Sequence, residues 1–197
     1  GWVRYDVLKA VGGAAATFEV VNGAYHLHAP PSPNPAFGPA RAAAYRPEVY
    51  TDFKVAMDFL DWDNENESQF GVFGRLNNPG LGRTGGYLFS YRAGLNHLAI
   101  FNLRNEGGLV VAERKGLVLD PTHDYRMVLA GKGGTLVAEL FDLANLEAPL
   151  VTLIGHDSLH LSGTSGFLVV TYKAGAAGDV VADNFKAGAG GELPAIP

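Results

Sequence analysis

Alternation of apolar and polar residues with a period of two is the feature that most constrains this chain. Within Thr51–Phe59, the residues Phe53, Val55, Met57 and Phe59 fall on one face, and the residues between them are mostly charged. Side chains of a β-strand point alternately to opposite faces, so this pattern predicts a strand with one buried face. Two nearly continuous apolar runs, 98–103 and 167–172, are typical of strands covered on both faces.

Turn-forming residues separate these strands about every 8–15 residues along the chain. Asn22-Gly23, between two β-type segments, predicts a hairpin with a type I′ turn. No segment has the apolar spacing of a convincing helix. The sequence therefore predicts about a dozen strands in an all-β fold, a jelly-roll sandwich of two antiparallel sheets with one curved face.

The length of 197 residues suits one domain of this kind. We expect residues 1–186 to form a single β-sandwich, followed by a Gly/Ala/Pro-rich tail at 187–197 that frays or links to another domain. Glycine makes up 26 of the 197 residues, or about 13%, which is nearly double the usual share of ~7% and fits many tight turns.

Charge and cysteine content exclude several classes of protein. The 15 Lys and Arg residues are outnumbered by 20 Asp and Glu, so the chain lacks the basic surface expected of a nucleic-acid-binding protein. No apolar run approaches the 18 or more residues that a membrane-spanning helix requires. With no cysteine, disulfides, thiolate metal sites and cysteine nucleophiles are excluded.

The order of several short motifs resembles a bacterial member of the concanavalin A-like lectin/glucanase superfamily, close to laminin-G-like and keto-disaccharide-hydrolase-like domains. Each motif is short, and their order over roughly residues 15–186 carries the resemblance. The motifs are Val21-Asn22-Gly23-Ala24-Tyr25-His26-Leu27, Tyr50-Thr51-Asp52-Phe53-Lys54-Val55, Gly71-Val72-Phe73-Gly74-Arg75, Gly86-Tyr87, Ser165-Gly166-Phe167 and Ala182-Asp183-Asn184-Phe185.

The resemblance implies a jelly roll, but this fold hosts lectins, hydrolases, lyases and adhesion modules alike. It also implies a structural Ca²⁺ on the convex side, for which Glu19, Asn22 and Asp183 are the expected side-chain ligands. The alternative is that Asp183 accepts backbone hydrogen bonds at a bulge.

A sugar-binding surface is predicted on the middle strands, because sugar recognition needs aromatic faces together with a few directed polar groups. The predicted ligand-binding residues are Gln69, Arg75, Tyr87, Tyr91, Arg92, Asn102 and Arg104. Phe73 and Tyr172 are further aromatic candidates. The alternative is that the aromatic side chains belong to the core, whereas the arginines are hard to bury without a partner.

Acidic residues cluster at Asp58, Asp61, Asp63, Glu65 and Glu67. Three interpretations remain open: a solvated loop, a Ca²⁺ site, or part of a catalytic pair of carboxyl groups.

Histidines occur in two close pairs. His26 and His28 share a strand face, and His156 and His160 flank Asp157. A pair of this spacing binds Zn²⁺ only if a third ligand converges on it, so surface histidines are the alternative.

Three functions remain open at this stage. The first is a secreted, non-catalytic carbohydrate-binding or adhesion module, extracellular or periplasmic, that binds a polysaccharide or oligosaccharide on the concave sheet. The second is a glycan-degrading hydrolase or lyase of the same fold, with a carboxylate of raised pKa facing Arg75. The third is a structural domain of a larger surface protein, joined to other domains.

Overall fold

The alternating segments form strands, as the pattern predicts. We describe a computed structural model of the chain, in which residues 1–62, 64 and 67–190 are placed. In β5 (Phe53–Trp62), the apolar face made by Phe53, Val55, Met57 and Phe59 is fully buried. The described helices are three short 3₁₀ turns, η1 (Lys9–Val11), η2 (Pro35–Phe37) and η3 (Ala93–Leu95), so the predicted all-β class is confirmed.

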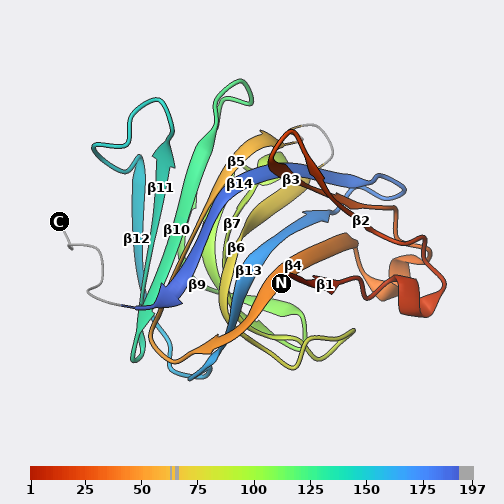
Figure 1. Ribbon diagram of the computed structural model, residues 1–197, viewed down its shortest axis with the longest axis horizontal. Helices are drawn as coiled ribbons and strands as arrows, with labels where there is room; N and C mark the ends of the chain where they lie inside the picture. Colours follow the sequence, from red (N-terminus) through yellow and green to blue (C-terminus); the bar gives the residue numbers. More distant parts are fainter. Residues whose placement is uncertain (63, 65–66, 191–197) are drawn as a thin grey trace.

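The described residues contain fourteen strands in two seven-stranded antiparallel sheets, which confirms the jelly-roll sandwich (Figure 1). Sheet A contains, in spatial order, β1 (Val3–Tyr5), β4 (Ala40–Tyr50), β13 (Gly163–Thr171), β6 (Ser68–Asn77), β7 (Gly85–Arg92), β8 (His97–Arg104) and β9 (Gly107–Lys115). Sheet B contains β12 (Val151–His156), β11 (Thr135–Asp142), β10 (Tyr125–Lys132), β5, β14 (Gly178–Ala189), β3 (Ala24–Ala29) and β2 (Thr17–Val21).

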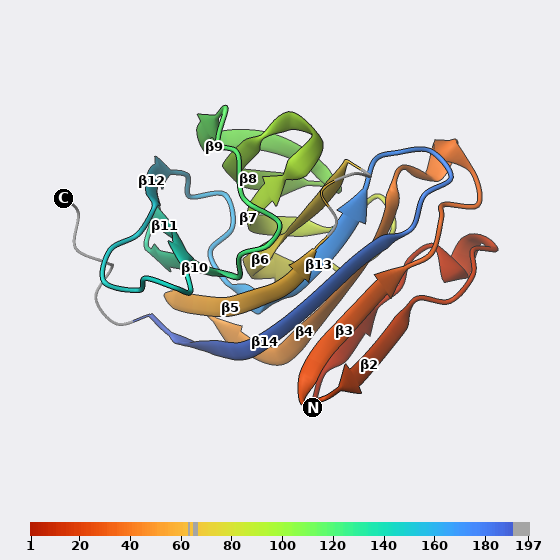
Figure 2. The same cartoon turned by 90° about the horizontal axis from the view of Figure 1, so that it is seen from above.

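The main hydrophobic core lies between the two sheets, which appear as stacked layers in Figure 2. Its centre is aromatic: the rings of Phe59 and Phe70 lie 4.8 Å apart, and those of Trp62 and Phe70 lie 5.1 Å apart. A second, smaller apolar cluster, which includes Phe73, Leu76 and Leu88, lies on the other face of sheet A. Sheet A is therefore apolar on both faces, which explains the continuous apolar runs in its strands.

The predicted hairpin joins β2 to β3. Val21 pairs with Ala24, and Asn22 and Gly23 between them have φ of 53° and 86°, the left-handed conformation that a type I′ turn requires. At the other end of the chain, β14 continues to Ala189, beyond the expected boundary at residue 186.

Close approach between neighbouring strands explains one glycine in sheet A. A Cβ atom on Gly166 of β13 would overlap the backbone oxygen of Ala44 in β4. In the part of the chain that is described, no helix has the length and apolar character needed to cross a membrane.

Candidate functional site

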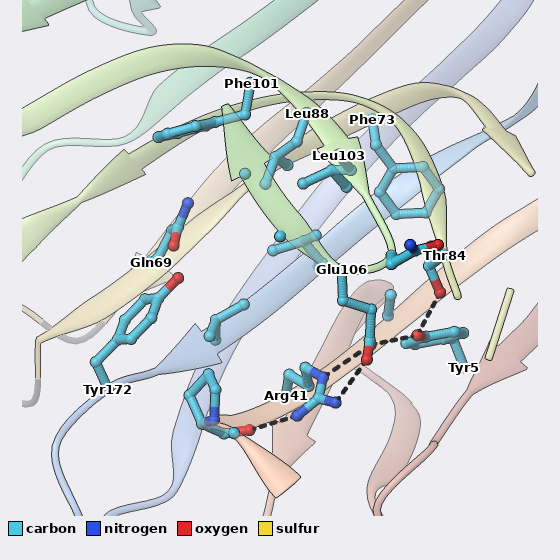
Figure 3. A pocket seen from close by; sticks show the side chains of 18 of the residues that line it. Tyr5, Arg41, Gln69, Phe73, Thr84, Leu88, Phe101, Leu103, Glu106 and Tyr172 are labelled. Carbon is cyan, nitrogen blue, oxygen red and sulfur yellow. Dashed lines mark hydrogen bonds and ion pairs between the residues drawn. The ribbon is translucent and has the colours of Figure 1, made fainter. Parts of the chain in front are cut away.

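An open hollow of about 720 Å³ lies on the outer face of sheet A (Figure 3). This volume falls within the range of roughly 300–1,000 Å³ that is usual for small-molecule sites. Its apolar lining is built from several neighbouring strands and includes Phe73, Leu76, Leu88, Phe101, Leu103, Leu168 and Val170.

Strand alternation determines which side chains reach this hollow. In β7, Tyr87, Phe89 and Tyr91 point into the core between the sheets, so Leu88 and Arg92 point to the outer face. The neighbouring strand β6 follows the same rule as far as Gly74, with Gln69 and Phe73 on the outer face.

One end of the hollow is closed by a network around Glu106 (Figure 3). The guanidinium of Arg41 donates to both carboxylate oxygens, each at 3.0 Å, and the hydroxyl of Tyr5 donates at 2.7 Å. The backbone N–H of Gly82 donates at 2.6 Å, and the hydroxyl of Thr84 lies 2.7 Å from that of Tyr5. Both oxygens of Glu106 are therefore occupied by partners within the protein.

The protonation of Glu106 follows from these contacts. Burial acts to raise its pKa, but the hydrogen bonds from Arg41, Gly82 and Tyr5 outweigh burial and hold the pKa below its usual range. Glu106 is therefore ionised at neutral pH. Among the described residues it is the only carboxylate that lines the hollow, so those residues provide neither a protonated carboxyl group nor a carboxyl pair there.

The other end of the hollow is formed by Gln69, Arg92 and Tyr172. The guanidinium of Arg92 lies 3.6 Å from the ring centroid of Tyr172, and it donates to Glu67 at 3.0 Å. The amide nitrogen of Gln69 donates to the hydroxyl of Ser90 at 2.6 Å. The side chain of Arg92 is 24% exposed, so part of this polar group remains open to the hollow, although its Nε is buried.

The residues predicted as a sugar-binding surface do not form one site. Gln69 and Arg92 line the hollow, as do the additional candidates Phe73 and Tyr172. Tyr87 and Tyr91 are fully buried between the sheets, because their shared face is the core face of β7. For Tyr87 and Tyr91, the structure therefore matches the alternative interpretation, in which these aromatic side chains belong to the core.

Strict alternation would place Arg75 on the same face of β6 as Gln69, but a bulge changes its direction. The register of β6 shifts between Gly74 and Asn77, and Arg75 has a φ of 50°. Its guanidinium is therefore buried and donates to the carbonyl oxygens of Thr51 at 2.6 Å, Gly133 at 2.8 Å and His160 at 3.1 Å. Among the described residues, the ion-pair partner of Arg75 is Asp52 at 3.7 Å, whose side chain is 39% exposed and lies outside the hollow.

Asn102 joins a second buried network at the edge of the sandwich. Asp157 accepts hydrogen bonds from the hydroxyl of Tyr87 and the amide of Asn102, both at 2.7 Å. Burial, followed by the contact with Asp157, raises the pKa of Tyr87 to about 12, so its phenol stays protonated. These contacts hold the segment between β12 and β13, so they explain why polar side chains occur on a core face. Arg104, at the end of β8, is exposed and does not line the hollow.

His160 completes this network. Its Nε2 lies 2.9 Å from the carbonyl oxygen of Leu103, which can only accept, so Nε2 carries the proton and Nδ1 accepts from Asn77 at 3.1 Å. Burial lowers the pKa of His160, and the neutral ring is the form that these contacts require.

The acidic cluster is divided between the two sheets. Asp58 is buried on the outer face of sheet B, where Arg126 donates to both of its oxygens, at 2.6 and 2.8 Å, and Asn184 donates at 2.9 Å. Glu67 pairs with Arg92 beside the hollow, and Asp61 is exposed. Asp63 and Glu65 lie outside the described residues.

The expected calcium ligands do not fit a metal site. Glu19 is exposed on β2, Asn22 is in the β2–β3 turn, and Asp183 accepts from the N–H of Asn184. Over residues 1–62, 64 and 67–190, no group of three or more His, Asp or Glu side chains is arranged to hold a metal ion.

The two histidine pairs have separate structural partners. His26 and His28 both contact one oxygen of Asp179, at 3.0 and 2.9 Å, so the carboxylate itself occupies the space between the two rings. His156 lies 3.4 Å from the hydroxyl of Thr135, apart from the His160 network.

Sequence reasoning missed Tyr5, Arg41 and Glu106. Tyr5 and Arg41 are 36 positions apart along the chain, Arg41 and Glu106 are 65 apart, and Tyr5 and Glu106 are 101 apart. The order of strands in sheet A brings β1, β4 and the β8–β9 turn together, and no short stretch of sequence indicates that order.

No protein-family model and no curated protein matches this chain. Solved structures do match it. A carbohydrate-binding module, CBM66 from Bacillus subtilis, is 17% identical with a TM-score of 0.68, and the match covers 95% of this chain and 94% of that one.

A protein of unknown function with a galectin-like fold, also from Bacillus subtilis, is 15% identical with a TM-score of 0.64, over 94% of this chain and 88% of that one. The exoplasmic/lumenal domain of VIP36, in a Ca²⁺/Man3GlcNAc-bound form, is 10% identical with a TM-score of 0.63, over 100% and 86%. These similarities show that the chain shares the jelly-roll fold of these proteins, which is the fold that its motifs imply.

Proposed function

We propose that this protein is a non-catalytic carbohydrate-binding module that binds a polysaccharide or oligosaccharide in the hollow of sheet A. The observation that carries the proposal is the hollow itself, which combines an apolar floor and aromatic rings with partly exposed polar side chains at one end. Sugars present an apolar C–H face and directed hydroxyl groups, and sites for such ligands combine these two kinds of surface.

The end of the hollow formed by Gln69, Arg92 and Tyr172 is the proposed contact for the sugar. The ring of Tyr172 is already held in place by the guanidinium of Arg92, so a stacking surface is prepared before a ligand binds. Arg92 and Gln69 supply the hydrogen-bonding groups. A preorganised surface of this kind loses little side-chain entropy on binding.

The ionised state of Glu106 favours a binding module over a hydrolase. A retaining glycosidase needs two carboxyl groups about 5–5.5 Å apart and an inverting enzyme about 6.5–9.5 Å, with one of the two protonated. Glu106 is held ionised by Arg41, and it is the sole carboxylate lining the hollow within the described part of the chain.

Proteins that share this fold add support, since one is a carbohydrate-binding module and another was crystallised with Man3GlcNAc. Polysaccharides are found mainly outside the cytoplasm, so an extracellular or periplasmic location, within a larger surface protein, suits the proposed role. Cell fractionation followed by immunodetection tests that location, and recovery in the cytoplasm alone would contradict it.

A glycan array, followed by calorimetric titration of the best ligand, tests the function. Arg92→Ala and Tyr172→Ala should each weaken binding about tenfold or more, because they remove the donor and the stacking surface. Arg104→Ala is a matched control, since that arginine is exposed and lies outside the hollow. Binding that is unchanged by all three substitutions would exclude this site, and the absence of any glycan ligand would contradict the function.

A further inference from the structure

The floor of the hollow is more apolar than hydroxyl groups require. Leu76, Leu88, Leu103, Leu168 and Val170 contribute aliphatic side chains, with no donor or acceptor of their own, along the strands of sheet A. A hydroxyl group buried against such side chains loses its hydrogen bonds to water without replacement, which opposes binding. The part of a ligand that covers this floor must therefore be hydrocarbon.

The charged groups at the closed end of the hollow are already hydrogen-bonded within the protein, and Asn105 beside them is an exposed polar side chain. Glu106 accepts from Tyr5, Arg41 and Gly82, and Arg41 donates further to the carbonyl oxygens of Phe37 and Pro39 at 2.8 and 2.9 Å. A sugar hydroxyl would have to break one of these charge-assisted contacts before it could bind there.

The polar groups with unused capacity lie at the opposite end. The side chain of Arg92 is 24% exposed and Tyr172 is 40% exposed, and in the described part of the chain no hydrogen bond of the Tyr172 hydroxyl is found. Gln69, Arg92 and Tyr172 thus form a polar end that can bind a headgroup, and an apolar floor extends away from it.

We infer that the ligand is an amphiphilic glycan, that is, a sugar carrying an alkyl or acyl chain, as in a glycolipid. The sugar contacts Gln69, Arg92 and Tyr172, and the chain lies on the floor toward Glu106. This inference rests on the proposed carbohydrate-binding function and adds the chemistry of the attached group.

A series of n-alkyl β-D-glucosides, from methyl to octyl, tests the inference at concentrations below micelle formation. Each buried CH₂ group contributes about 0.8 kcal/mol, so the affinity should rise about threefold to fourfold per added carbon until the chain fills the hollow. A negative heat-capacity change that grows with chain length should accompany the gain.

Two controls locate the effect. Leu168→Trp fills the floor with a bulky apolar side chain, so it should abolish the dependence on chain length. Leu146→Trp, at an exposed leucine that does not line the hollow, should leave it unchanged. The far-ultraviolet circular dichroism of both variants should match that of the original protein.

The outcomes separate this inference from the function on which it rests. Equal affinity for methyl and octyl glucosides would overturn the inference and leave the binding module intact. Sodium octanoate, used as a chain without a sugar, should bind more weakly than octyl glucoside. If it binds as tightly, the sugar makes no contribution, and the amphiphilic glycan is refuted together with the proposed function.

Discussion

Replacing the buried Arg75 with methionine should destabilise the fold without changing the binding site. The guanidinium donates to three backbone carbonyl oxygens, at 2.6, 2.8 and 3.1 Å, and its exposed fraction is 1%. Hydrogen bonds to a charged group contribute about 1.5–3 kcal/mol each. Taking the lower figure for all three, Arg75→Met should lower the free energy of unfolding by about 4–5 kcal/mol.

Urea denaturation, followed by circular dichroism, measures this change, and the melting temperature should fall by roughly 8–20 °C for a chain of this size. Arg75→Lys keeps the charge but cannot reach all three carbonyl oxygens from one nitrogen, so it should recover only part of the loss. Arg104→Met is the control at an exposed arginine, with an expected change within about 0.5 kcal/mol.

Two results would refute this account of Arg75. A loss below about 1 kcal/mol would mean that the three hydrogen bonds do not stabilise the fold. If the Arg75→Met protein is folded but binds glycan more weakly, Arg75 would have to be assigned to the binding site.

Three other perturbations have definite expected outcomes. Burial holds the pKa of His160 below its unfolded value of about 6.5, so the contribution of His160 to stability is complete above that pH and decreases as the pH falls toward the folded pKa. Between pH 7.5 and pH 5.5, the free energy of unfolding should therefore fall more in the original protein than in His160→Gln. Equal losses in the two proteins would contradict this account of His160. Gly166→Ala should cost several kcal/mol because its Cβ overlaps the Ala44 oxygen, whereas Gly188→Ala, with nothing nearby, should be close to neutral; similar melting temperatures for both would refute the steric argument. Melting temperatures in Ca²⁺ and in chelator should agree, because the described residues offer no metal site; a higher temperature in Ca²⁺ would reveal one.

Local patterns predicted the fold well because the alternation of apolar and polar residues within a strand indicates that the strand has a buried face. The alternation in Thr51–Phe59 placed Phe53 and Val55 in the core, and Asn22-Gly23 identified its hairpin from two residues. Both features depend on neighbours in the sequence, so a single chain is enough to recognise them.

The site was harder to predict because alternation alone does not say which face is the core. Tyr87 and Tyr91 do share a face of β7, but that face is buried in the core. The side chains that reach the hollow, Leu88 and Arg92, are on the opposite face of the strand. Sheet A is apolar on both faces, so hydrophobicity could not distinguish them.

Backbone irregularity caused the misplacement of Arg75. A bulge adds one residue to a strand and reverses the faces beyond it. Here the register shift after Gly74 turns Arg75 inward, although strict alternation would have placed it beside Gln69. Sequence spacing counts residues and cannot detect the bulge.

Mapping the bound ligand onto the sheet by nuclear magnetic resonance is the most direct test of the account. A glycan selected on the array is titrated into isotopically labelled protein, and the shifts of backbone amides and of leucine methyl groups are followed. We expect the largest changes at Gln69, Leu88, Arg92, Leu168 and Tyr172, which line the hollow of sheet A. Changes confined to the outer face of sheet B, or to the segment between β12 and β13, would contradict the account.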